Sequence, residues 1–264
     1  VHTVLGETLL WRGEFTRAQA HLDQAGAFYD PEHHRDLAYQ VGQDPGLMAL
    51  GDAARTLWYH GYPDQALERV HHAHSLSQAL LHPFSLAQAL GDVAHVHLFR
   101  REGQEAQAHA EALLTLAHEH EFAQWSANGT SLQGWALVEC ATLSDAWEQR
   151  EAGLVQLREG LAAVRPMGGE LWVPLFLGAL AQGYGHGDQA QEGLKVIAEA
   201  LALVEKNEER WNEAELYRIK GELTLQQANQ KSKGKSQKSK METDPRPLTP
   251  HPQGEAEVCF LKAL

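Results

Sequence analysis

Cysteine, β-strand patterning and long hydrophobic runs are all scarce in this 264-residue sequence. The two cysteines, Cys140 and Cys259, are too few for a disulfide scaffold or a four-thiolate zinc site, and they fit a reducing compartment. The longest strongly apolar run, Leu171 to Ala181, is far shorter than the roughly 20 residues of a membrane-spanning helix. No basic segment followed by an apolar core opens the chain. We therefore expect a cytoplasmic protein without a membrane partner.

The hydrophobic pattern predicts helices. No segment alternates apolar and polar residues for more than a few positions, as a half-buried strand would. In Ala190–Leu203 the apolar residues instead follow the 3-4-3 spacing of one helix face. Pro63, Pro83 and Pro174 stand near expected helix starts, where the missing N–H costs little. With 43% hydrophobic residues, the chain has enough apolar surface to bury a core.

The charge balance is acidic, with 22 basic against 35 acidic residues and a formal net charge of −13. A body that binds nucleic acid shows a basic face. We therefore expect no direct nucleic-acid partner.

A repeat is visible in the spacing of small and large residues. From Leu5 to Ala25 the series runs Gly6, Leu9, Gly13, Ala18 and Leu22, the residue types that the tetratricopeptide (TPR) pattern places where two helices cross. The series recurs along the chain. The anchors of the second helices are Ala18, Ala66, Ala106, Gly153, Gly193 and Ala256.

The repeat unit is near 40 residues, longer than the roughly 34 of the standard TPR, so HEAT and armadillo repeats remain alternatives. The turns GEFTRA (Gly13–Ala18) and GYPDQA (Gly61–Ala66) favour the TPR type. The predicted fold is an all-α, right-handed superhelical solenoid of TPR-like helix pairs. Residues 1–228 would hold about five pairs plus the first helix of a sixth, and 255–264 would begin the second helix of that last pair.

Residues 229–254 differ in composition. They contain four prolines and five of the chain's nine lysines and show no apolar periodicity, which predicts a disordered basic insert. The chain starts at Val1 inside what looks like a helix, and it ends inside another. We expect it to be part of a longer protein.

Short strings that imitate catalytic motifs fail on their context. Gly234-Lys235-Ser236 lacks the first glycine of a phosphate-binding loop, because position 229 is Asn, and no buried strand precedes it. The string GHGDQA at 185–190 lies between two helical segments rather than after a strand. No G-x-S-x-G elbow occurs. These observations predict a chain that is not an enzyme and needs no cofactor.

The histidines leave one enzymatic alternative open. His71 and His74 share a helix face, so two metal ligands could converge there, but a third would have to come from another repeat. A histidine-dependent metal hydrolase is therefore kept as an alternative, against ordinary surface histidines.

The repeat register also predicts a binding surface, because the first helices of a TPR array line a concave groove. Aromatic and Arg side chains in such a groove are the usual anchors for a protein or peptide, although each one alone is equally well explained as core. The predicted groove residues are Trp11, Arg55, Trp58, Tyr59, His95, Phe99, Trp135, Glu139, Gln182, Arg218 and Glu222.

Whole phrases of the sequence resemble a known family. The strings LGETLLWRGEFTRAQAHLDQA, GYPDQALERVHHAHSLSQALLHPFSLAQAL, GLVQLREGLAAVR and ERWNEAELYRIKGELTLQQA resemble the C-terminal TPR region of large bacterial signalling ATPases of the AAA/STAND type. Those proteins often carry an N-terminal adenylate or guanylate cyclase domain. The resemblance implies a sensor arm that binds a protein or ligand, or the parent's own ATPase or cyclase domains, and gates the output. None of the family's catalytic residues has a counterpart here. A stand-alone peptide-binding adaptor is the alternative.

Overall fold

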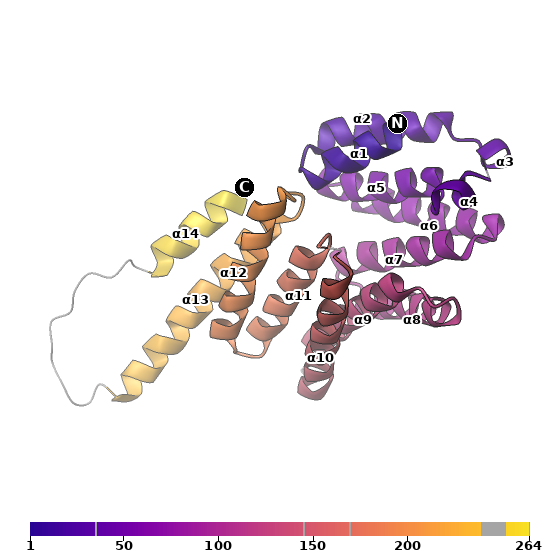
Figure 1. The fold of residues 1–264 in the computed structure, drawn as a ribbon. Helices are drawn as coiled ribbons and strands as arrows, with labels where there is room; N and C mark the ends of the chain where they lie inside the picture. The colour runs from indigo at the N-terminus through magenta and orange to yellow at the C-terminus, as the bar shows by residue number, and fades with distance from the viewer. Residues whose placement is uncertain (35, 145, 169, 239–251, 264) are drawn as a thin grey trace. The chain divides into compact units, whose positions relative to one another are not determined.

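The computed structural model describes residues 1–34, 36–144, 146–168, 170–238 and 252–263, and within these ranges the regular structure is helical (Figure 1). The chain divides into two compact units, Val1–Gly169 and Glu170–Leu264. The helices of the first unit are α1 (His2–Trp11), α2 (Phe15–Phe28), α3 (Pro31–His34), α4 (Leu37–Val41), α5 (Pro45–Tyr59), α6 (Pro63–Leu80), α7 (Pro83–Phe99), α8 (Gly103–Glu119), α9 (Ala123–Ser144), α10 (Trp147–Val164) and the 3-10 helix η1 (Arg165–Met167). Those of the second are α11 (Val173–His186), α12 (Ala190–Asn207), α13 (Glu213–Lys238) and α14 (Pro252–Ala263).

Proline, aspartate and glycine set the helix boundaries. Pro63 and Pro83 are the first residues of α6 and α7, as the sequence predicts, and Pro45 opens α5. Asp44 caps α5, because its carboxylate accepts hydrogen bonds from the backbone N–H groups of residues 46 and 47 at 2.9 Å. Gly61 turns the chain between α5 and α6 with a φ of +83°, which favours glycine.

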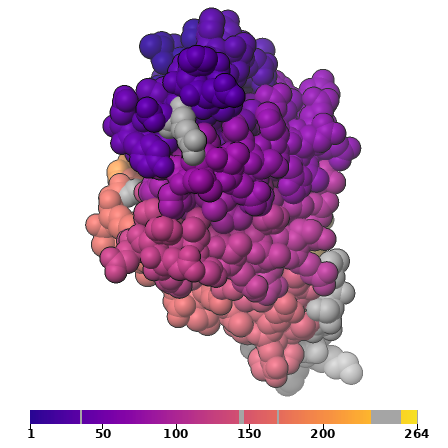
Figure 2. Space-filling view, turned by 90° about the vertical axis from the view of Figure 1, so that its right-hand side faces the viewer, coloured from indigo at the N-terminus to yellow at the C-terminus, as the bar shows by residue number. Residues whose placement is uncertain are grey.

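The helices of the first unit pack in sequential pairs, α1 with α2, α5 with α6, α7 with α8, and α9 with α10. The second helix of one pair also contacts the first helix of the next, and the first helices α1, α5, α7 and α9 are neighbours in that order. In Figure 2 the indigo, purple and magenta surfaces of these helices follow one another along the unit. The helices α3 and α4 occupy the long connection between α2 and α5.

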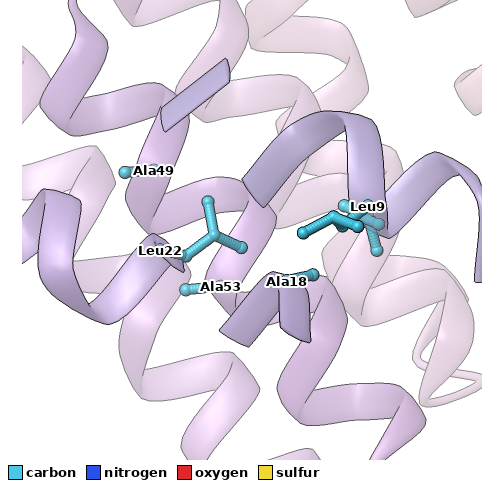
Figure 3. Packing of buried hydrophobic residues seen from close by; sticks show 6 residues of the cluster. Leu9, Ala18, Leu22, Ala49 and Ala53 are labelled. Atoms are coloured by element: carbon cyan, nitrogen blue, oxygen red, sulfur yellow. The ribbon is translucent and has the colours of Figure 1, made fainter. Parts of the chain in front are cut away.

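The core forms at the positions that the repeat predicts. In the first pair, Leu9, Leu10, Ala18 and Leu22 are buried together with Ala49 and Ala53 of α5. Figure 3 draws this cluster between the helices and labels all of its residues except Leu10. The small residues let the helices approach closely, while the leucines fill the space. The anchors Ala66, Ala106 and Ala256 are likewise buried.

Helices α9 and α10 cross at two glycines. A Cβ added to Gly153 would lie 2.6 Å from the carbonyl oxygen of Gly134, and a Cβ on Gly134 would lie 2.7 Å from the carbonyl oxygen of Gly153. No side chain fits at these separations, so only glycine at both positions permits this crossing. The sequence predicts Gly153 as one of the small anchors of the second helices.

The second unit contains two pairs, α11 with α12 and α13 with α14. Helix α13 continues to Lys238, ten residues into the segment predicted as a disordered insert, and residues 239–251 lie outside the described part of the chain. Helix α14 begins at Pro252 rather than at 255. Its residues Ala256 and Cys259 are buried, and Phe260 packs where a Cβ on Gly221 would be.

Candidate functional site: an aromatic ledge on the first helices

The predicted groove residues of the first unit lie on its first helices. Arg55, Trp58 and Tyr59 belong to α5, His95 and Phe99 to α7, and Trp135 and Glu139 to α9. These three helices are neighbours in one layer, so residues about 40 positions apart in sequence meet at one surface. The repeat register thus brings together seven of the predicted side chains.

Four aromatic side chains form a row across these helices, which we call the aromatic ledge: Trp58, Tyr59, Phe99 and Trp135. The rings of Trp58 and Phe99 stack with centroids 5.5 Å apart, and Phe99 meets Trp135 edge-on at 6.1 Å. Tyr59 contacts Phe99 at 6.4 Å and stacks on Phe15 at 4.6 Å. Trp58, Tyr59 and Phe99 are half-buried, with Trp58 packed against the core between α5, α6 and α7, and Trp135 is only 7% exposed. The ledge therefore offers a rigid aromatic surface.

A buried ionic group lies on the same helices as the ledge. Arg55, only 4% exposed, binds Asp52 one turn earlier on α5 and Asp92 on α7. Burial raises the pKa of Asp52 to about 7 against the lowering effect of Arg55, and it raises the pKa of Asp92 as well. The sequence predicts Arg55 as a groove anchor, but the structure places it as a link between two first helices.

His95 and Glu139 are also buried rather than open to a partner. The Nδ1–H of His95 donates to the carbonyl oxygen of Gly91 at 2.8 Å, and burial, helped by the charge of Arg55, lowers its pKa to about 3. Glu139 accepts from the indole N–H of Trp135 at 3.3 Å and from Arg101 at 2.8 Å. Glu139 thus fixes the orientation of the innermost ring of the ledge.

The other predicted residues lie elsewhere. Trp11 ends α1 and is half-buried. Gln182 on α11 and Arg218 and Glu222 on α13 belong to the second unit. Arg218 binds Glu222 at 2.5 Å within its own helix. The predicted set therefore separates into a first-unit surface and three residues of the second unit.

Four histidine side chains lie together in the structure, and the sequence predicts only two of them as neighbours. His71 and His74 of α6 are joined by His97 of α7 and His109 of α8, with ring centroids 5.7–6.4 Å apart. The spacing of His71 and His74 predicts that they share one face of a helix. It does not predict His109 as their neighbour, because His109 lies on α8 in the next repeat. Across the described residues, no group of three or more His, Cys, Asp or Glu side chains is arranged to hold a metal ion.

Solved structures similar to this chain are TPR-like repeat proteins. BtubC from P. vanneervenii is 15% identical with a TM-score of 0.51, and the match covers 89% of this chain and 96% of that one. A Rap protein complexed with Competence and Sporulation Factor is 16% identical with a TM-score of 0.50, over 88% of this chain and 63% of that one. A kinesin-light-chain-like protein of Podosopora anserina with nearly identical TPR-like repeats is 15% identical, with a TM-score of 0.48, over 78% of this chain and 94% of that one.

These likenesses show the fold, and the predicted class, an all-α solenoid of TPR-like helix pairs, is confirmed. No protein-family model matches the sequence, and no curated protein matches it. Among the helices that the structure describes, none has the length and apolarity to cross a membrane.

Proposed function

We propose that this chain is a non-catalytic binding module that holds a protein or peptide segment on the aromatic ledge of its first unit. The observation that carries the proposal is the continuous row of Trp58, Phe99 and Trp135 across three neighbouring helices. Trp58 and Phe99 are partly exposed, whereas Trp135 is only 7% exposed and packs edge-on against Phe99. Exposed rings that are already ordered bury a large area on binding at a small cost in conformational entropy. The TPR-like fold supports the same role.

The buried groups behind the ledge make the surface rigid. Glu139 orients Trp135, and Arg55 joins α5 to α7 through its two carboxylates. A partner would therefore meet a preformed surface rather than one that must be ordered on binding.

A random peptide library displayed on phage and selected against the whole chain supplies the probes for a test. The dissociation constants of the selected peptides are then measured for the chain and for Trp58→Ala. We expect binding to weaken about 30-fold, corresponding to about 2 kcal/mol for an interface anchor. Arg55 is unsuitable for this test, because its removal would leave two buried carboxylates unpaired.

The matched control is Trp147→Ala on α10, which removes an indole that is 62% exposed and lies outside the ledge. Its affinity for the peptides should equal that of the unchanged chain, and circular dichroism should show the same helix content for all three proteins. Peptides that bind Trp58→Ala and Trp147→Ala equally well would place the binding surface elsewhere and refute the proposal.

The family phrases in the sequence support a more specific version, in which the module is a cytoplasmic sensor arm of a bacterial signalling ATPase or nucleotide cyclase. A partner on the ledge would gate the output only by binding one arrangement of the repeats better than another. The test is to read the gene upstream of Val1. A phosphate-binding loop in the same reading frame is expected, and its absence would leave the stand-alone adaptor.

A further inference from the structure

Four imidazole rings from three helices form a cluster at the junction of the second and third helix pairs, which we call the histidine cluster: His71, His74, His97 and His109. The ring of His109 on α8 stacks on His97 with centroids 5.7 Å apart and meets His74 edge-on at 5.8 Å. His71 completes the group, 5.7 Å from His97 and 6.4 Å from His109. Each contact joins different helices, so the cluster connects α6 to both helices of the next pair.

Negative charge is scarce around these rings. The Nδ1–H of His97 donates to Glu102 at 2.7 Å, and that carboxylate also accepts from Arg100 at 2.8 Å. Among the described residues, the charged groups that act on His71, His74 and His109 are the neighbouring imidazoles. A second or third proton in the cluster would therefore meet the like charge of a neighbouring ring. The carboxylates near the rings are Glu102, which is already bound by His97 and Arg100, and Glu119, which lines the same groove as His74 and His109.

Burial and mutual repulsion both oppose protonation. Desolvation is the largest cause that lowers the pKa of His71, His74 and His109, and the other imidazoles lower it further. For His109 the pKa falls to about 4. In the unfolded or opened chain the imidazole titrates near 6.5, so the open state takes up protons first as the pH falls.

Water reaches the cluster from one side. His74 and His109 line an open groove of about 570 Å³, together with Leu86 and Leu90 of α7 and Leu116 of α8. Protons can therefore exchange with solvent without unfolding of the whole chain. The lining is mixed, because Gln78, Thr115 and Glu119 also line the groove beside the apolar side chains that desolvate the two rings.

We propose that the histidine cluster is a proton-operated switch that holds α6 against α7 and α8 while its rings are neutral and releases this contact when they are protonated. The inference is independent of what the aromatic ledge binds. Because the pKa values of His71, His74 and His109 are lower in the folded state, the contact is at full strength above pH 6.5 and weakens as the pH falls from 6.5 towards 4.

Hydrogen exchange of the whole chain at pH 7.5 and 5.5, corrected for the intrinsic rates, tests the proposal. We expect amides of α6 and α8 to lose protection at pH 5.5 relative to those of α1 and α2. The folding equilibrium constant should fall about tenfold over this interval through His109 alone. In His109→Gln this tenfold fall in the folding equilibrium constant should be absent. In His118→Gln, at an exposed position of the same helix, the fall should be the same as in the unchanged chain.

An NMR titration of the histidine rings in the unchanged chain gives a readout that needs no variant. A ring of His109 that titrates near 6.5, or equal acid sensitivity of His109→Gln and His118→Gln, would overturn the proposal. So would a pH response that disappears in EDTA, because the cluster would then respond to a bound metal ion rather than to protons.

Discussion

Two arginines of the predicted groove bind two carboxylates each, but in opposite surroundings. Arg55 in the first unit is 4% exposed, and one of its partners, Asp92, lies 37 residues away on another helix. Arg218 in the second unit is half-buried, and both of its partners are within one turn on its own helix. Arg55 thus joins two repeats, whereas Arg218 makes contacts only within its own helix.

Burial decides how much an ion pair contributes to the free energy of unfolding. Removing one member of a buried group leaves charges that water cannot reach, whereas an exposed pair exchanges one set of hydrated contacts for another. Arg55 should therefore be essential for the fold and Arg218 almost dispensable. Three measurements of stability test this difference.

The largest effect is expected from Arg55→Met. The methionine keeps much of the side-chain volume, but Asp52 and Asp92 lose their shared cation while they remain buried. The free energy of unfolding at pH 7.5 should fall by about 3–5 kcal/mol in urea denaturation. Arg17→Met, at an exposed arginine on α2, is the control and should change stability little. Equal losses in the two variants would contradict the role assigned to burial.

Glu209 tests whether the same rule holds in the second unit. It is 2% exposed, accepts from the indole N–H of Trp211 at 2.7 Å, and has its pKa raised to about 7 by burial. A folded-state pKa above the unfolded value means that stability falls as the pH rises from about 4.5 through 7. Between pH 5 and pH 8 the ionisation of this carboxyl should lower the free energy of unfolding by about 2 kcal/mol.

Glu209→Gln keeps an acceptor for Trp211 but cannot ionise. The free energy of unfolding of this variant should therefore change less between pH 5 and pH 8 than that of the unchanged chain. Urea denaturation at pH 5 and pH 8 measures the difference. Glu170→Gln, at a carboxylate bound to Lys206 on the surface, is the matched control. If both variants show the pH dependence of the unchanged chain, Glu209 is not the buried acid that the structure indicates.

The smallest effect is expected from Arg218→Met. Its two ion pairs are local and partly exposed, so the free energy of unfolding should change by less than about 1 kcal/mol. Salt screens such pairs, and in 1 M NaCl the variant and the unchanged chain should become indistinguishable. A loss that approaches the one for Arg55→Met would show that α13 depends on this arginine in a way that its exposure does not reveal.

The helix pairs could be read from the sequence because the repeat records which residues touch. Gly153, Ala66 and Ala106 occupy positions where only a small residue lets two helices cross, so their spacing predicts the pairing directly. The length of α13 could not be read in this way. Its last ten residues have no apolar periodicity, and apolar periodicity is the pattern from which the sequence predicts a helix.

The sequence alone also indicated the aromatic ledge, because the repeat register places Tyr59 and Phe99 40 residues apart at corresponding points of successive first helices, and Trp135 at the point that corresponds to His95. Tertiary structure alone decided that Arg55 is enclosed between two carboxylates and that His109 joins His71 and His97. Periodicity specifies which face of a helix a residue occupies. The depth of that residue below the surface, and its neighbours from other repeats, depend on how closely the helices pack, and these set its charge state and its role.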